Sequence, residues 1–598
     1  MVSAWTWVQD ELLLKPCLYP TALASLCGGA ALLLLLRKWT GRSRYEAAIR
    51  NARTQRDETL RAMERDGLGV EMVGKMGQPA VKKCSGDVES ILSLSLHELR
   101  DKLQGGSFDP DSVLHAYMVK ALEVNKQLNC LTEFLPECQT QLQDFQEKHK
   151  GLLYGIPISI KDNINCKGHD STCGLGVFLN QPATEDSVIV QVLKKQGAIP
   201  FVKTNVPQSL LSYECCNPIF GQTINPHNTK RTSGGSSGGE AALIAAGGSI
   251  LGIGSDIGGS IRVPASFCGI CGFKPTGKRL SSIGLRGSIP GQKAVEAAIG
   301  PLARDVDSLT LCMKALLCED MFHLDPTVPP LPFNDEVYSR SKPLRIGYYE
   351  SDGFWIPTAS MKRAVMETKH LLEEAGHTLV PFTPLRTSYA FKEYVLKGIW
   401  ADCGFLILEN LKGDIIDHNL KDILYTFKVP AVLKKILSFL LKPLNPRLAD
   451  ILMSLCGIGS ISELWKHHTA IEAYCREYIK IWKSKNLDVL LCPALGPAFR
   501  VGYAGSLSVT SSYKIIFNLL NFPAGVVPVG TVTEKDEEEL KDYVGYYNDY
   551  WEKAFKKGMS GAVGLPIAVQ CAALPWQDEL CLYFMKEVER VTQKNRGT

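Results

Sequence analysis

The sequence predicts an α/β fold built around one large mixed β-sheet. From about residue 91 onward, short apolar runs typical of strands alternate with stretches of helical spacing, which is the order of elements in α/β proteins. Hydrophobic residues make up 45% of the 598 residues and charged residues 21%, as in ordinary globular proteins. This composition, without an internal repeat, excludes a mainly disordered chain, a coiled coil and a collagen-like repeat.

Charge and cysteine content narrow the possible functions. The formal net charge of +4 is too balanced for a dedicated nucleic-acid binder. The 19 cysteines are scattered, without paired C-x-x-C spacing of the kind that binds zinc. We therefore expect reduced thiols facing the cytosol, no metal and no cofactor. Cys268 and Cys271 form a lone C-x-x-C, which we interpret as two buried small residues rather than a redox pair.

The amino terminus predicts a membrane anchor. Residues 16–36 carry no charge, and a helix of this length spans about 31 Å, the thickness of a hydrocarbon core. Acidic residues precede the run, and Arg37 and Lys38 follow it, so the positive-inside rule places residues 1–15 in the lumen and the rest in the cytosol. A cleaved signal peptide, which prefers a basic start, and a buried core helix are the weaker alternatives.

The next residues separate the anchor from a catalytic domain that we expect over 91–598. Residues 37–90 are charged and polar, and 45–66 predict a solvated connecting helix. Asp109 and Ser112 can cap the first helix of the domain. A second helix is expected over 187–196, and strands are expected over 152–160, 198–202, 344–348, 489–491 and 525–529.

Residues 326–332 include Pro329, Pro330 and Pro332. We interpret this segment as a rigid surface connector. The alternative is a polyproline segment that binds a partner domain.

The most informative stretch is the glycine- and serine-rich region 233–265. It satisfies G-x-S-x-G at Ser236 and at Ser237, but a polar loop stands where a hydrolase elbow needs a buried strand. A phosphate-binding loop ending at Lys278 fails because Arg279 replaces the required Ser or Thr. A dinucleotide fingerprint fails because Ile257 occupies its last glycine position.

The same stretch carries a spaced set of residues: Gly234, Ser236, Ser237, Gly238, Gly239, Asp256, Gly258, Ser260, Arg262 and Pro264. In these positions it resembles the signature of the amidase family. The resemblance extends from about residue 91 to the end of the chain, with further matches around Lys161 and at 522–525. It implies the amidase-signature fold, a large mixed twisted sheet covered by many helices.

The residues themselves suit an amidase. Gly258 and Gly259 allow successive backbone amides to point at one spot before Ser260, and such a spot can stabilise an oxyanion. Serine needs a base; no histidine lies near these motifs, whereas Lys161 ends an apolar run, and burial lowers the pKa of a lysine.

The resemblance assigns roles to these residues. It implies Ser260 as nucleophile, Ser236 as proton relay and Lys161 as base and later acid. It also implies an oxyanion hole and substrate contacts at Ile257, Gly258, Gly259, Ser260, Ser236 and Leu210. Ser237 and Asp256 are expected to be structural, with Arg262 paired to a carboxylate such as Asp256.

A second membrane contact is predicted at residues 423–455. From 423 to 449 the chain combines apolar residues with five basic ones, Lys428, Lys434, Lys435, Lys442 and Arg447. Helices over 431–442 and 446–455 are too short to span a bilayer but can lie in its anionic surface. The alternative is a core helix with a solvated lysine side.

With an anchor and an apolar insert, the chain resembles the membrane-bound, lipid-hydrolysing members of the amidase family. That resemblance implies cleavage of fatty acid amides, meaning N-acylethanolamines such as anandamide and primary amides such as oleamide. It also implies an endoplasmic reticulum membrane and a homodimer. The alternatives are a general amidase or ester hydrolase, and a catalytically silent membrane protein that binds or scaffolds lipid amides.

Overall fold

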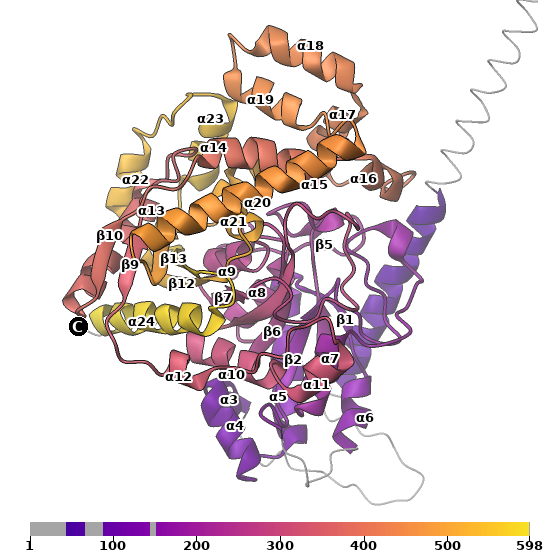
Figure 1. Ribbon diagram of the computed structural model, residues 1–598. Coiled ribbons are helices and arrows are strands. Elements are labelled where there is room, and N and C mark those ends of the chain that lie inside the picture. Colours follow the sequence, from indigo (N-terminus) through magenta and orange to yellow (C-terminus); the bar gives the residue numbers. More distant parts are fainter. Residues whose placement is uncertain (1–42, 66–87, 144–150, 597–598) are drawn as a thin grey trace, which may run out of the picture.

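An eleven-stranded mixed sheet runs through the centre of the protein, as expected from the sequence (Figure 1). The computed structural model describes residues 43–65, 88–143 and 151–596. In spatial order, the strands are β1 (Leu131–Phe134), β3 (Ile199–Thr204), β2 (Pro157–Lys161), β6 (Leu251–Asp256), β8 (Ala298–Ala303), β7 (Cys271–Lys274), β12 (Ala524–Thr531), β13 (Pro566–Ala573), β11 (Val489–Pro493), β9 (Arg345–Tyr348) and β10 (Thr378–Pro381).

Two parallel regions flank an antiparallel centre. β2 pairs in parallel with β3 and β6, and β9 pairs in parallel with β10 and β11. The carboxyl ends of β2 and β6 therefore meet at one edge of the sheet, with Ile160 opposite Ile253. In open α/β sheets this edge is where ligands bind.

Helices cover the sheet and extend beyond it (Figure 1). The first half contains α3 (Val88–Leu92), α4 (Leu96–Gln104), α5 (Pro110–Leu128), α6 (Glu137–Gln143), α7 (Val188–Lys195), α8 (Gly238–Ala245), α9 (Arg262–Cys268), α10 (Val306–Leu316), α11 (Glu319–Leu324) and α12 (Asp335–Tyr338). The second half contains α13 (Ala359–Glu374), α14 (Thr387–Tyr389), α15 (Lys397–Ile399), α16 (Phe405–Asn410), α17 (Lys421–Lys428), α18 (Ala431–Leu441), α19 (Pro446–Ser454), α20 (Ile461–Ser484), α21 (Ser512–Leu519), α22 (Glu534–Leu540), α23 (Tyr550–Met559) and α24 (Asp578–Arg596).

Local sequence signals account for several boundaries. Asp109 caps α5 by accepting a hydrogen bond from the Ser112 amide, and Pro110 occupies the first turn. Ser187 caps α7 in the same way. Ile158 and Ile160 in β2, and Leu251 and Ile253 in β6, are fully buried, which is typical of a parallel sheet covered on both sides.

The helix over 43–65 is not the solvated connector that its charge pattern predicts. Ile49 is 3% exposed and Met63 is fully buried. Arg53 donates from Nε to the Ile219 carbonyl and from a second nitrogen to the Pro218 carbonyl, each at 2.7 Å. The helix therefore packs against the catalytic domain, because the apolar side of a charged helix is buried on a partner that is distant in sequence.

Two further expectations concern segments outside the sheet. The expected anchor at 16–36 lies outside the described residues, and within the described ranges no helix is both long and apolar enough to cross a bilayer.

The proline segment over 326–332 is bound to the body of the protein. Arg279 donates hydrogen bonds to the carbonyls of Leu331 and Pro332 in this segment.

The insert between β10 and β11 forms the helices expected from the sequence, but not all of its lysines face outward. Lys434 is buried and donates to the Leu455 carbonyl at 2.6 Å. Arg447 is buried against Glu552 at 2.9 Å. Two of the five basic residues expected beside an anionic surface therefore face inward, because the Leu455 carbonyl after α19 and Glu552 of α23 hold them inside.

Candidate active site

Lys161 and Ser236 lie in direct contact at the carboxyl edge of the parallel strands. Lys161 ends β2, is completely buried, and donates from Nζ to Ser236 Oγ at 2.8 Å. Ser236 stands just before α8 and is 2% exposed. The peptide bond between Gly235 and Ser236 is cis.

Ser255 completes the surroundings of the lysine. Lys161 Nζ lies 2.9 Å from Ser255 Oγ and 3.1 Å from its carbonyl oxygen. Because β6 runs parallel to β2, Ser255 reaches the lysine from the neighbouring strand end. The Ser255 hydroxyl donates onward to Asn163 Oδ1 at 3.3 Å.

The electrostatics of this pocket favour a neutral amine. Burial lowers the pKa of Lys161 from 10.5 to about 7, although Asp256 opposes that shift. The groups in hydrogen-bond contact with the amine are hydroxyls and a carbonyl, and none of them is a carboxylate. A lysine with this pKa can accept a proton near neutral pH.

Glu240 forms a second buried polar site beside β2. Its carboxyl accepts from Ser159 Oγ at 2.5 Å and from Thr204 Oγ1 at 2.7 Å. Burial raises the pKa of Glu240 to about 7. This group links α8 to the two strands β2 and β3 behind the lysine, and nothing in the sequence pattern distinguishes it from an ordinary helical glutamate.

Asp256 and Arg262 shape the turn that carries Ser260. The Asp256 carboxylate accepts from the amides of Gly259 at 2.8 Å and Ile261 at 3.0 Å, and it pairs with Arg262 at 2.9 Å. Burial opposes the ionisation of Asp256, but Arg262 outweighs it and holds the pKa of Asp256 below its usual range. The expected pairing of Arg262 with Asp256 is confirmed.

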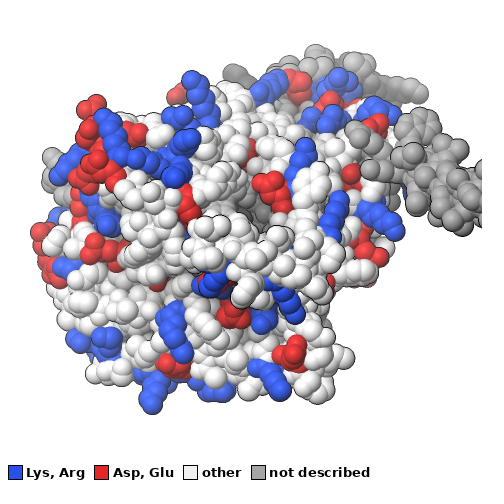
Figure 2. Space-filling view, turned by 90° about the horizontal axis from the view of Figure 1, so that it is seen from above, with Lys and Arg blue, Asp and Glu red and all other residues white. Residues whose placement is uncertain are grey.

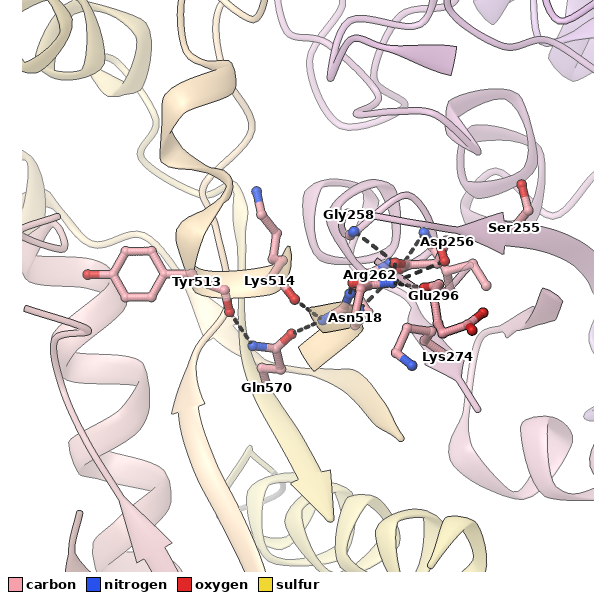
Figure 3. A network of polar contacts seen from close by, with 12 residues as sticks. Ser255, Asp256, Gly258, Arg262, Lys274, Glu296, Tyr513, Lys514, Asn518 and Gln570 are labelled. Carbon is pink, nitrogen blue, oxygen red and sulfur yellow. Dashed lines mark hydrogen bonds and ion pairs between the residues drawn. The ribbon is translucent and has the colours of Figure 1, made fainter. Parts of the chain in front are cut away.

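Arg262 extends this network to the second half of the chain (Figure 3). It donates to Asn518 Oδ1 at 2.6 Å, Gln570 Oε1 at 2.8 Å and the Lys514 carbonyl at 3.0 Å. The network therefore joins the turn before Ser260 to α21 and β13.

The sequence matches the amidase family over residues 112–582. The chain belongs to the amidase family. It is 50% identical to fatty-acid amide hydrolase 1 of Sus scrofa over 96% of this chain and 97% of the relative. It is 41% identical to fatty acid amide hydrolase 1 of Caenorhabditis elegans over 83% of this chain and 88% of the relative. A solved fatty acid amide hydrolase superposes with a TM-score of 0.75 at 24% identity, covering 91% of this chain and 95% of that one.

Amide hydrolysis is the reaction that this amidase shares with its family. The structure places the expected site residues on neighbouring segments of the sheet edge. The amide of Ser237 donates to the Ser260 carbonyl at 3.0 Å, which joins the Ser236 segment to the glycine turn. Ser260 itself is 6% exposed, at the turn that leads into α9.

The glycine turn presents backbone amides, although one of the expected donors is engaged. Gly259 has a φ of +104°, a conformation that L side chains rarely adopt, and its amide already donates to Asp256. Within the described residues, the amides of Ile257, Gly258 and Ser260 have no hydrogen-bond acceptor. These three are the donors that remain for an oxyanion.

Leu210 lies on a loop that approaches this turn. The loop places Ser212 against Gly235, where a Cβ atom would come within 2.2 Å of the Ser212 carbonyl oxygen. The hydroxyl of Tyr213 donates to the Gly258 carbonyl at 2.9 Å. Leu210 is half-buried and packs on the core, so the expected substrate contact belongs to a segment adjoining the site.

One group of residues outside this site has ligand-like spacing. The side chains of Cys216, Asp417 and His418 bring their ligand atoms within 4.8 Å of one another in the described part of the chain. The Asp417 carboxylate already accepts from the Asn419 amide at 2.9 Å, as in a capped turn.

Proposed function

We propose that this amidase hydrolyses fatty acid amides at a membrane, releasing a fatty acid and an amine or ammonia. The observation that carries the chemistry is the buried contact between Lys161 Nζ and Ser236 Oγ at 2.8 Å. Substrates of this class include N-acylethanolamines such as anandamide and primary amides such as oleamide. The similarity to fatty-acid amide hydrolase 1 over nearly the whole chain supports this choice.

The proposed reaction begins with a neutral Lys161. Its amine takes the proton of Ser236, while Ser236 takes the proton of Ser260, and Ser260 Oγ attacks the amide carbonyl. The free amides of the glycine turn stabilise the oxygen that becomes negatively charged. Three neutral side chains thus pass one proton inward, and no fixed carboxylate is needed beside the amine.

Collapse of the intermediate requires the proton to return. The Lys161 ammonium gives it back through Ser236 to the leaving nitrogen, because an amine leaves poorly unless it is protonated. The acyl group stays on Ser260 until water releases it as the fatty acid. Lys161 therefore acts first as a base and then as an acid.

The proposed membrane contact rests on the insert over 423–455. Phe439 is 80% exposed and Leu444 is 82% exposed, which is unusual for large apolar side chains in water. The view from above shows a broad uncharged area with both basic and acidic side chains around it (Figure 2). Further exposed apolar side chains on α18 are Val432, Leu433, Ile436, Leu437 and Leu440.

We further propose the organisation expected from the sequence around this contact. Residues 16–36 span the bilayer, residues 1–15 are lumenal, and the catalytic domain from residue 91 faces the cytosol. The chain acts as a homodimer at the endoplasmic reticulum, without metal or cofactor. The insert would then draw acyl chains from the bilayer toward Lys161.

A single labelling experiment tests the chemistry. A fluorophosphonate reacts with an activated serine, so mass spectrometry of the labelled protein is expected to find the adduct on Ser260. Release of oleate from oleamide is expected in the same preparation. Labelling elsewhere, or an unlabelled protein that releases no oleate, contradicts the proposed function.

A further inference from the structure

One buried lysine lies beside the glycine turn and takes no part in the proton transfer described above. Lys514 comes from α21, and its aliphatic stem covers Gly259, where a Cβ atom would come within 2.8 Å of Lys514 Cδ. Its Nζ lies 4.0 Å from the ring centroid of Tyr213. Because the Tyr213 hydroxyl bonds to the Gly258 carbonyl, both side chains are held against the turn that precedes Ser260.

The amine of Lys514 is unusual among the buried lysines. The residue is 1% exposed, yet Nζ has no hydrogen-bond acceptor among the described residues. Burying a polar group without an acceptor is unfavourable. Each of the other buried lysines in the described part of the chain donates to at least one acceptor: Lys161, Lys203, Lys274 and Lys434.

The neighbouring network does not use this amine either. Arg262 binds the backbone carbonyl of Lys514 at 3.0 Å and fixes the start of its side chain (Figure 3). Asp256 is already occupied by Arg262 and by the turn amides. Asp256, the carboxylate that acts on the charge of Lys514, is therefore committed to other partners, and the amine is left available to a ligand.

Charge favours an anionic ligand at this position. Burial first, and then repulsion by Arg262, lower the pKa of Lys514 well below its ordinary value, while Asp256 offsets part of this effect. An anion in contact with the amine stabilises its protonated form. A charge-assisted hydrogen bond is stronger than a neutral one, so a carboxylate gains more here than a hydroxyl.

We propose that Lys514 selects substrates whose amine portion carries an anion, that is, fatty acyl amides of amino acids. In such a substrate the acyl chain is apolar and the carbonyl oxygen goes to the turn amides. The remaining polar group is the carboxylate on the amine portion, which Lys514 binds. This inference rests on the proposed amide hydrolysis and specifies its substrate class; water still cleaves the C–N bond, giving a fatty acid and a free amino acid.

The test compares two substrates that differ in one group. N-oleoylglycine carries a carboxylate where N-oleoylglycinamide carries a neutral amide of similar shape. Oleate release by the full chain in detergent micelles gives kcat/KM for each. The wild-type protein is expected to favour the carboxylate at least tenfold. Equal rates, or a preference for the glycinamide, would overturn the inference.

Two variants assign that preference to a residue. Lys514→Met is expected to lower the ratio of the two kcat/KM values about tenfold or more, whereas Lys514→Arg retains most of it. Lys274→Met is the control, because it also removes a buried lysine but one that donates to the Pro275 carbonyl at 2.9 Å. A ratio that falls equally in both Met variants contradicts a specific role for Lys514.

The outcomes separate the two proposals. A wild-type protein that releases oleate from the glycinamide and from oleamide, but not from N-oleoylglycine, overturns the anion inference alone. A protein that releases oleate from none of the three overturns amide hydrolysis and the inference with it. If Lys514→Met does not fold, the wild-type comparison and Lys514→Arg still decide the question.

Discussion

Ser236 Oγ is the hydroxyl acceptor of Lys161 Nζ at 2.8 Å, and Ser255 supplies the other two acceptors of that amine. In the proposed mechanism this lysine carries a proton rather than serving as a counter-ion. Its role as an acid is distinguishable from its role as a base because amides and esters differ in their leaving groups.

Lys161→Ala is expected to reduce amide hydrolysis about 10² to 10⁴-fold and ester hydrolysis at least tenfold less. An alkoxide leaves more readily than an unprotonated amine, so the ester depends less on the acid. Rates on matched oleoyl amide and ester substrates measure the difference. Ser260→Ala is the reference and should abolish both activities with an unchanged circular dichroism spectrum. Equal losses in Lys161→Ala would contradict its acid role.

The pH profile should report the titration of Lys161. Its pKa of about 7 in the folded protein means that the fraction of neutral amine rises as pH increases through 7. The rate is therefore expected to rise about tenfold per pH unit well below 7 and to level off above it. Lys161→Glu, with a weaker base, is expected to give a lower rate and a different profile. An unchanged profile in that variant would assign the titration to another group.

Asp256 is expected to be required for folding rather than for chemistry. Its ion pair with Arg262 is completely buried, and removing one partner of such a pair costs about 3–5 kcal/mol. Asp256→Ala should lower the free energy of unfolding by about this amount in urea titrations. Glu472→Ala is the control, because its pair with Arg476 is 69% exposed on both sides and should contribute little. A stable Asp256→Ala protein would contradict this account of the turn.

The helix over 43–65 should stabilise the catalytic domain. Ile49 is 3% exposed and packs with Leu179, Ile219 and Phe220. Ile49→Ala is expected to cost about 2–4 kcal/mol in thermal or chemical unfolding. Arg50→Ala, at the exposed neighbouring position, is the control and should change little. Equal stabilities of the two variants would indicate that the helix does not pack on the domain in solution.

A protein lacking residues 1–36 is expected to remain active and to bind liposomes through the insert. Phe439→Glu with Leu440→Glu should release it into the supernatant on co-sedimentation, because both side chains are more than half exposed. Ile283→Glu, at an exposed apolar position outside the insert, is the control. A truncated protein that stays wholly soluble beside anionic liposomes at low salt excludes the membrane contact.

Salt is expected to weaken this binding only moderately. Lys434 and Arg447 face inward, and Lys442 pairs with Asp450. Lys428 and Lys435 remain exposed on the insert, and each contributes roughly 1 kcal/mol near an anionic surface. If binding weakened with salt as steeply as expected for five unpaired basic side chains, the burial of Lys434 and Arg447 would be contradicted.

Sequence reasoning predicted features that depend on local patterns. The cap at Asp109, the helix expected over 187–196 and the apolar strand ending at Lys161 follow from neighbouring residues, and the structure has them. The family signature brought Lys161 and Ser236 into one hypothesis although 75 residues separate them. The pairing of Arg262 with Asp256 belongs to the same signature.

Features that depend on distant partners were not predictable. The inward side chains of Lys434 and Arg447 are held by Leu455 and Glu552. The local sequence of a lysine flanked by leucines is the same whether that lysine faces the interior or the solvent. Ser255 contacts Lys161 because two strands are parallel neighbours. Lys514 reaches Gly259 across more than 250 residues, and the absence of an acceptor is a property of the packed interior.

The insert over 423–455 belongs to the part of the chain between β10 and β11, and both of these strands pair with β9. The chain between them therefore lies outside the register of β2, which ends at Lys161, and of β6, which leads into the turn that carries Ser260. Its helices can lengthen, shorten or change their exposed side chains without altering the hydrogen bonds of that ladder. A homologous chain could thus present a different surface at the insert while the strand pairings beside the reaction centre are inherited unchanged.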